Sequence, residues 1–387
     1  RYVADAVYIG GKQLSLRSRA SNFSLEEIAE GVKFAKQYGA RVHVTVNMIP
    51  HDEDLHDVEE YLKALEECGV HAIICASVSI MQLCKKAAPK LEVHVSTQQT
   101  NTNAASVAFW QKMGMDRVVL AREMTLSQIE DITKHSEIET EVFIHGGMCV
   151  NYSGRCTLSN RMTLRDANRG GCAQSCRWKY RMYDADNQLV SDPECLFSMS
   201  AKDLQAARYI PALMDAGVSS LKIEGRMKTA YYVACVVKAY RRLIDTYETK
   251  GFVSEEDYAA CIRELEKAEN RPTSNGFYEG LPDANCHLYG TNGAGVIQDF
   301  VATVKSYDSL SQMAVIQVRN HFVAGTRLEV MSPTIDNETF VAGTLYTMDG
   351  MVQEVANKPM QLLRVKIPFE VQKDDFIRKV SEENVCG

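Results

Sequence analysis

Residues 41–75 read RVHVTVNMIPHDEDLHDVEEYLKALEECGVHAIIC, and this stretch decides the fold class. It begins with a β-branched apolar run over residues 41–47 and ends with a second apolar run over 71–75. Between them, residues 58–68 place apolar side chains at helical spacing, and Gly69 follows as a helix-ending glycine. A strand, a helix and a further strand in this order predict a parallel β–α–β unit.

The same unit repeats from the first residues to about residue 250. Strand-like runs fall at 6–10, 41–47, 71–75, 91–95, 117–121, 140–144 and 219–223, and helical stretches fall at 25–38, 58–68, 102–113, 126–135, 203–216 and 231–247. Seven repeats in a chain that opens just before a strand predict an α/β fold, a TIM-like (β/α)8 barrel whose first strand and helix precede Arg1. An open doubly wound sheet is the alternative.

A second domain follows a charged helix at 254–269 and a turn-rich stretch at 271–295, which we interpret as a linker or an irregular edge. Strand-like runs then fall at 301–306, 313–319, 326–331, 343–348, 361–367 and 376–380. They predict a small antiparallel β-barrel. We therefore divide the chain into a barrel domain over residues 1–290 and a C-terminal β-barrel domain over 291–387.

The charge balance limits the classes of partner. The 387 residues include 43 Lys and Arg against 50 Asp and Glu, which excludes a generally basic nucleic-acid coat protein. An RNA partner would need a local basic patch. Because no run approaches the roughly 18 apolar residues of a membrane helix, we expect no membrane partner and a cytoplasmic protein.

Four cysteines stand together in a long insertion over residues 146–193 of the barrel domain. They are Cys149, Cys156, Cys172 and Cys176, spaced C-x6-C-x15-C-x3-C, whereas the other eight of the 12 cysteines are scattered. Four thiolates from one loop favour a metal site, and the absence of tight C-x2-C pairs favours an iron-sulfur cubane over zinc. Two disulfides or a set of buried thiols remain as alternatives.

The same insertion is basic. Between positions 155 and 181 the sequence has seven Lys and Arg residues and only one acid, Asp166. The basic residues include Arg169 and Arg177. Trp178 and Tyr180 are interleaved with them, a pattern that would suit phosphate binding and base stacking on RNA. The alternative is that these charges offset the thiolates and keep the loop solvated.

Polar residues follow the predicted strands, so a barrel would place them on its C-terminal rim, where active sites are usually built. They include Gln98, Gln99, Arg122, His145, Lys222, Glu224 and Arg226. We predict that Lys222 and Arg226 hold carboxylates of a small organic acid, and that His145 and Glu224 move protons. The alternatives are a strand-end histidine satisfied by backbone and a structural Glu224–Arg226 pair.

Residues 141–159, EVFIHGGMCVNYSGRCTLS, resemble the signature of the collagenase-like peptidases of family U32, with Gly147 where Ser or Ala is usual. ADAVYIGG at 4–11, NRGGCAQSCRW at 168–178 and SLKIEGRMK at 220–228 are similar to family segments in the same order. The resemblance covers the whole chain. It implies a TIM-like barrel, a C-terminal β-barrel and a 4Fe-4S cluster on Cys149, Cys156 and Cys172, with Cys176 as our choice for the fourth ligand.

Although named for peptidases, the family includes oxygen-independent hydroxylases of tRNA, ribosomal RNA and the ubiquinone ring. The length and the appended barrel resemble the tRNA branch most, which implies 5-hydroxyuridine at the wobble position and prephenate as the co-substrate that gives the hydroxyl group. The expected partners are a tRNA anticodon stem-loop and a small organic acid. The sequence leaves open whether the chain acts alone, as a homo-oligomer or with a paralogue.

Two other functions stay open. The first is proteolysis, although the sequence contains no H-E-x-x-H, G-x-S-x-G or Asp-Ser/Thr-Gly motif. The second is a non-enzymatic RNA-binding protein with a structural metal cluster. Convergence of His145, Glu224, Arg226 and the Gln98–Gln99 segment on one rim would favour an enzyme by analogy with other barrels.

Overall fold

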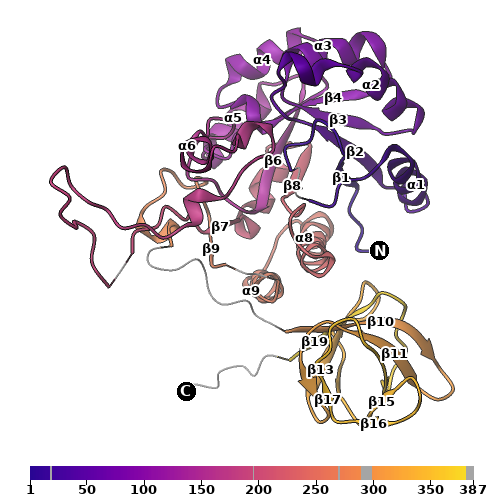
Figure 1. The fold of residues 1–387 in the computed structure, drawn as a ribbon. Coiled ribbons are helices and arrows are strands. Elements are labelled where there is room, and N and C mark those ends of the chain that lie inside the picture. Colours follow the sequence, from indigo (N-terminus) through magenta and orange to yellow (C-terminus); the bar gives the residue numbers. More distant parts are fainter. Residues whose placement is uncertain (18–19, 195, 269–270, 289–298, 381–387) are drawn as a thin grey trace.

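In the computed structural model, which describes residues 1–17, 20–194, 196–268, 271–288 and 299–380, parallel strands alternate with helices in the N-terminal part (Figure 1). The strands are β1 (Ala6–Gly10), β2 (Arg41–Val46), β3 (Ala72–Cys75), β4 (Glu92–Val95), β5 (Arg117–Val119), β6 (Glu139–Gly146) and β8 (Ser220–Ile223). The helices are α1 (Leu25–Lys36), α2 (Val58–Glu67), α3 (Val78–Ala87), α4 (Ala104–Lys112), α5 (Leu126–Lys134), α7 (Ile210–Asp215), α8 (Ala230–Lys250) and α9 (Glu255–Glu266).

The order of these strands excludes the doubly wound alternative. β1 to β6 pair in chain order, and β8 pairs with β6 in parallel, so the order never reverses as it does in a doubly wound sheet. The Tyr8 hydroxyl of β1 donates to the Ile223 carbonyl of β8 at 3.3 Å, which brings the two ends of the sheet together. Between β8 and β1 the described residues form no backbone ladder. The predicted TIM-like fold class is confirmed.

Local sequence signals set the helices as predicted. Ser24 caps α1 and forms a reciprocal capping box with Glu27, and the buried side chains Ile28 and Val32 face the strands. Gly39 follows α1 at φ +71°, a conformation that favours glycine. Within the described residues, no helix combines the length and the apolar character that a membrane span requires.

One prediction was wrong in this domain. The predicted helix 203–216 begins as a strand, β7 (Asp203–Gln205), antiparallel to the end of β6, because the Ala206 N–H donates to the Ile144 carbonyl and extends the sheet. The stretch interpreted as a linker or an irregular edge contains β9 (Thr273–Ser274), which pairs with β7 at the edge of the barrel sheet. The insertion also contains a short helix, α6 (Leu158–Thr163).

The C-terminal residues form a separate antiparallel barrel with its own apolar core, as predicted (Figure 1). Its strands are β10 (Phe300–Asp308), β11 (Met313–Val318), β12 (Phe322–Val323), β13 (Arg327–Met331), β14 (Thr339–Val341), β15 (Leu345–Thr347), β16 (Val352–Gln353), β17 (Val355–Ala356), β18 (Leu362–Lys366) and β19 (Phe376–Lys379). The expected domain boundary at residues 290 and 291 lies outside the described residues.

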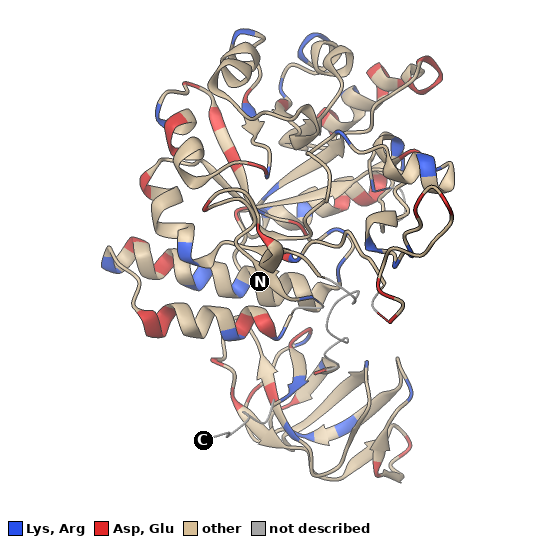
Figure 2. Cartoon of the chain, turned by 90° about the vertical axis from the view of Figure 1, so that its left-hand side faces the viewer, with Lys and Arg blue, Asp and Glu red and all other residues tan. Residues whose placement is uncertain are grey.

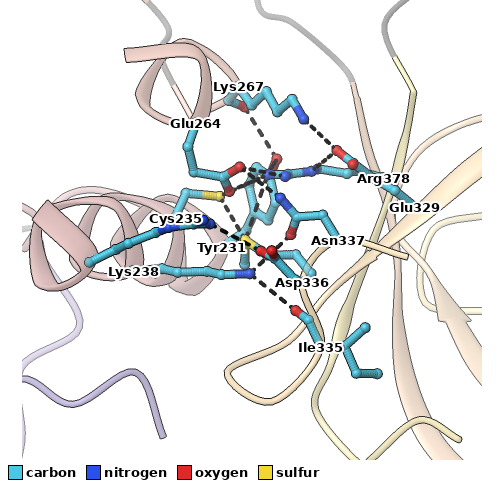
Figure 3. Close-up of polar contacts among 12 residues, drawn as sticks. Tyr231, Cys235, Lys238, Glu264, Lys267, Glu329, Ile335, Asp336, Asn337 and Arg378 are labelled. Carbon is cyan, nitrogen blue, oxygen red and sulfur yellow. Dashed lines mark hydrogen bonds and ion pairs between the residues drawn. The ribbon is translucent and has the colours of Figure 1, made fainter. Parts of the chain in front are cut away.

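A buried ion-pair network joins the two domains (Figure 3). Arg378 of β19 is fully buried and donates from both terminal nitrogens to Glu264 of α9, each at 2.8 Å. Its Nε donates to Glu329 of β13 at 2.5 Å, and Lys267 donates to the same carboxylate at 2.7 Å. Tyr231 of α8 stacks on Phe300, with ring centroids 4.6 Å apart. Charge pairing and aromatic packing therefore fix the C-terminal barrel against α8 and α9.

Candidate functional site

A small pocket of about 60 Å³ lies at the carboxyl ends of the parallel strands. Its lining comes from β1 to β6 and β8 or the loops that follow them, so one cavity collects residues from all seven strands. The lining residues are Tyr8, Leu16, Arg17, Thr45, Asn47, Ile74, Ser96, Thr97, Gln98, Val119, Arg122, Phe143, Lys222, Glu224 and Arg226. Four cationic side chains against one carboxylate make this pocket suited to an anion.

Lys222 stands at the pocket wall but is already paired. Its Nζ donates to Glu141 at 2.5 Å, and Arg117 donates to the other oxygen of that carboxylate at 3.0 Å. Burial alone would raise the pKa of Glu141, but the two cations hold it below its usual range. Because Lys222 already forms an ion pair with Glu141, the geometry gives little support to the expectation that Lys222 binds the carboxylate of a ligand.

Glu224 and Arg226 follow β8 into the pocket. Tyr8 donates to Glu224 at 3.1 Å, and although burial would raise the pKa of Glu224, Arg17 and Arg122 hold it lower. The Arg226 guanidinium donates to Thr45 at 3.0 Å and to Asn22 at 2.7 Å, while Glu224 accepts the Arg226 backbone N–H. The two side chains therefore have separate partners instead of the structural Glu224–Arg226 pair that was the alternative, and Glu224 stays ionised beside a phenol.

Only one of the two glutamines predicted at the rim lines the pocket. Gln98 lines the pocket, whereas the Gln99 side chain donates to the Ala76 carbonyl and is absent from the lining. Arg122, which follows β5, lines the pocket and lies 5.1 Å from the centroid of the Phe143 ring. Its Nη1 donates to the Gly147 carbonyl at 2.5 Å, so the pocket wall is tied to the start of the insertion.

The start of the insertion is fastened to the loops after β4 and β5. Ser153 donates from its backbone and its hydroxyl to Glu123, and Thr100 donates to the Ser153 carbonyl at 2.6 Å. Gly154 sits at φ +75°, where an added Cβ would lie 2.0 Å from the Gln98 carbonyl oxygen. Only glycine fits this close approach. These contacts hold the segment that carries Cys149 and Cys156 next to Gln98, which lines the pocket.

The four cysteines of the insertion are free thiols. Burial raises the pKa of the Cys176 thiol, the Arg177 guanidinium lowers it, and the thiols of Cys149, Cys172 and Cys156 raise it. Three sulfurs accept N–H donors: Cys149 from Arg122 at 3.6 Å, Cys156 from Asn151 at 3.1 Å and Cys172 from the Gln174 backbone at 3.4 Å. Such a thiol group suits a soft metal or an iron-sulfur centre.

His145 lies outside the pocket, contrary to the predicted rim position. The ladder between β6 and β8 shifts register between Phe143 and His145, and such a bulge turns the next side chain to the other face. His145 is therefore buried against α8, 3.3 Å from the Tyr240 hydroxyl, and burial lowers its pKa to about 3. A neutral histidine outside the pocket is a packing residue, and its partner is the Tyr240 hydroxyl rather than the backbone group of the alternative interpretation.

Arg169 and Arg177 are engaged within the fold. Arg169 pairs with Asp54 at 2.7 Å, and the half-buried Arg177 donates to Ser200 and to the Met148 carbonyl. Arg169 and Arg177, which were expected to contact substrate, therefore form contacts within the protein. Arg161, Lys179 and Arg181 are exposed on the same insertion and have no ion pair with any described residue. Figure 2 shows basic and acidic residues interspersed over both domains, in keeping with the absence of a broadly basic character.

Sequence reasoning missed Tyr8, Arg17 and Thr45 as pocket residues. Tyr8 and Thr45 lie within strands, where the alternation of side chains could have placed them inside the barrel. Arg17 lies in an irregular segment after β1, and the sequence contains no periodic signal that would place it there.

Two family models match the chain: peptidase family U32 over residues 1–287 and the U32 C-terminal domain over residues 297–378. A protein of Bacillus subtilis named tRNA hydroxylation protein P1 is 44% identical over 98% of this chain and 90% of its own length. The 23S rRNA 5-hydroxycytidine C2501 synthase of Escherichia coli is 43% identical over 62% of this chain and 36% of its own length. A protein of Porphyromonas gingivalis named collagenase is 32% identical over 86% of this chain and 82% of its own length.

These matches extend over both domains, and they confirm the family that the quoted segments of the first domain resembled. This chain belongs to peptidase family U32.

Proposed function

We propose that the protein is an oxygen-independent iron-sulfur enzyme that hydroxylates tRNA, forming 5-hydroxyuridine at the wobble position with prephenate as the hydroxyl source. One observation carries the proposal: a loop with four thiols is fastened beside a pocket lined by Arg17, Arg122 and Arg226. Redox-capable sulfur ligands and an anion-binding pocket are the two parts that a carboxylate-dependent hydroxylation needs.

The spacing of the four thiols supports a cubane over zinc, because the tight C-x2-C pairs of structural zinc sites do not occur among them. In a 4Fe-4S cubane each thiolate binds a different iron. Cys149, Cys156, Cys172 and Cys176 would hold such a cluster, which would supply one-electron transfer.

The pocket residues have separate tasks in this proposal. Arg226 and Arg122 bind the carboxylates of the small acid, because guanidinium groups match carboxylates bidentately. Glu224 is ionised and touches the Tyr8 hydroxyl, so the pair is placed to accept a proton and pass it on. Phe143 and Ile74 exclude water from the inner wall. His145 has no task here, because it lies outside the pocket.

The exposed cations of the insertion are the proposed RNA contact. Arg161, Lys179 and Arg181 would bind backbone phosphates, and the Trp178 ring, 43% exposed, would stack on a base. The names of the relatives favour tRNA over ribosomal RNA, since the tRNA protein aligns with both domains and the ribosomal enzyme with 62% of the chain.

The test begins with anaerobic purification followed by iron and sulfide analysis and visible absorption. We expect close to four irons per chain for a 4Fe-4S cluster and their loss in Cys149→Ala. Cells that lack the gene should lose 5-hydroxyuridine in digested tRNA, and the wild-type gene should restore it, whereas Arg226→Gln should not. Full iron in Cys149→Ala, or unchanged hydroxyuridine after deletion, would contradict the proposal.

Proteolysis is the second candidate, favoured by the relative named collagenase. Cleavage of a peptide by rigorously purified protein, abolished in Glu224→Ala, would support it. Stable RNA binding by an iron-loaded protein that modifies nothing would instead support a non-enzymatic role.

A further inference from the structure

Arg122 is a wall of the anion pocket and also donates to a thiol of the insertion. Its Nη2 lies 3.6 Å from the Cys149 sulfur, and its Nη1 donates to the Gly147 carbonyl. The Phe143 ring lies against the guanidinium, with 5.1 Å between the Arg122 Cζ and the ring centroid. The plane of the guanidinium is therefore fixed by three contacts, two of which belong to the start of the insertion.

One donor of this guanidinium is free among the described residues. The Arg122 Nε is buried and has no hydrogen-bond partner there. A buried N–H without a partner costs about 1–3 kcal/mol, so its presence calls for a ligand that supplies an acceptor. Arg122 is one of the residues that line the pocket, and the pocket suits an anion.

Lys222 and Arg226 differ from Arg122 in one respect. Neither has a buried N–H without a partner among the described residues. Lys222 donates to Glu141, and the Arg226 guanidinium donates to Thr45 and Asn22. Glu224, the one carboxylate of the lining, interacts electrostatically with both Arg17 and Arg122. Arg122 thus combines an unused donor with a donor already committed to a cysteine sulfur.

We propose that Arg122 is a positioning residue that couples binding of a small carboxylate in the pocket to the Cys149 sulfur. A carboxylate oxygen accepts the Nε–H, and the rigid guanidinium transmits this contact to the Nη2–H that meets the sulfur. This inference rests on the proposed function, because it concerns the metal centre that Cys149 would hold. It adds a connection between the two halves of the site.

The direction of the coupling follows from electrostatics. An N–H donor to a metal-bound sulfur stabilises the reduced, more negative state and raises the reduction potential. A carboxylate bound to the same guanidinium weakens the hydrogen bond from Arg122 to the sulfur and adds negative charge near the metal centre. Binding of the small acid is therefore expected to make the reduction potential more negative.

The experiment compares four anaerobically purified, iron-loaded proteins: wild type, Arg122→Gln, Arg122→Lys and Arg263→Gln. Each is titrated with malonate as the carboxylate probe, with chloride at matched ionic strength as reference, while visible absorption and reduction potential are recorded. Arg263 is the control, because it is an exposed arginine of α9 outside the pocket lining and has no part in the proposed site. We expect a saturable negative shift in wild type and Arg263→Gln that is lost in Arg122→Gln.

Arg122→Lys separates charge from geometry, since a lysine keeps the positive charge but lacks the planar fork. We expect it to bind iron and retain no more than a small part of the shift. An undiminished malonate shift in Arg122→Gln, or none in wild type, would overturn the inference while leaving the iron content to judge the proposed function. Loss of iron in both Arg122 variants with the fold retained would show a purely structural role and overturn it as well.

Discussion

Side chains two residues apart on one strand serve different purposes in this protein. Phe143 lines the pocket, whereas His145 is buried against α8 beside Tyr240, because a register shift separates them. Strict alternation would have placed both inside the barrel. The histidine is kept neutral by its surroundings, so its contribution is to stability and depends on pH.

We predict that His145 makes the protein less stable at mildly acidic pH. Its pKa is lowered to about 3 in the folded state by burial and, less strongly, by Lys228, while an unfolded histidine titrates near 6.5. Between these values the unfolded chain binds more protons, so stability is full above about pH 6.5 and falls as the pH decreases toward 3. From pH 7 to 5 the expected loss from this residue is about 2 kcal/mol.

Urea unfolding of wild type and His145→Gln at pH 7 and pH 5 measures this loss. Glutamine keeps a polar group near the Tyr240 hydroxyl but does not titrate, so its stability should change less over the interval. His43 is also buried with a lowered pKa and contributes equally to both proteins, which leaves the difference to His145. Equal pH dependence in the two proteins would show that His145 is not protonated on unfolding.

At the scale of elements, the insertion is positioned by its contacts with the barrel loops rather than by regular structure of its own. Gly154 lies against the Gln98 backbone, and Ser153 binds Glu123. These contacts come from the loops after β4 and β5, which also supply Gln98 and Arg122 to the pocket. Pocket and thiol loop are thus built on shared elements.

We expect Gly154→Ala to displace the thiol loop. The added Cβ would meet backbone atoms of Gln98 at 2.0 Å, and the positive φ adds strain for any other residue. The protein should lose about 1–3 kcal/mol of stability and most of its iron. Gly343→Ala is the matched control, since no heavy atom lies within 4 Å of its added Cβ. Iron content and unfolding curves indistinguishable from wild type in Gly154→Ala would contradict this account.

At the scale of the whole molecule, the buried network around Arg378 holds the two domains together (Figure 3). Although burial would lower it, the Glu264 carboxylate keeps the pKa of Arg378 raised, so the guanidinium stays charged in the interface. A buried pair of this kind adds little net stability but is costly to break, because the remaining charge lacks a partner.

We predict that Arg378→Ala destabilises the protein by about 3–5 kcal/mol and makes the two domains unfold separately. Scanning calorimetry should show one transition in wild type and two in the variant. Arg242→Ala is the control: Arg242 pairs with Asp336 at 3.1 Å on the exposed side of the same junction, and its loss should cost less than about 1 kcal/mol. A single, unshifted transition in Arg378→Ala would refute the role of this network.

The sequence by itself determined the repeating β–α units, the antiparallel C-terminal domain and most of the candidate pocket residues. These features depend on local signals, namely strand and helix periodicity, caps such as Ser24 and the glycines that follow helices. Such signals can be recognised without knowing the tertiary contacts. Gln98, Arg122, Lys222, Glu224 and Arg226 were all expected at the strand ends, and the pocket contains all five.

Tertiary structure alone decided which of these groups are free to bind a ligand. The bulge in β6 places His145 outside the pocket. Lys222 forms an ion pair with Glu141. Arg169 pairs with Asp54, and Arg177 donates to the Met148 carbonyl. Each outcome depends on partners distant in sequence, which no local pattern encodes. A charged residue type can be read from the chain, but whether its charge is available depends on which neighbours the fold brings within hydrogen-bonding distance.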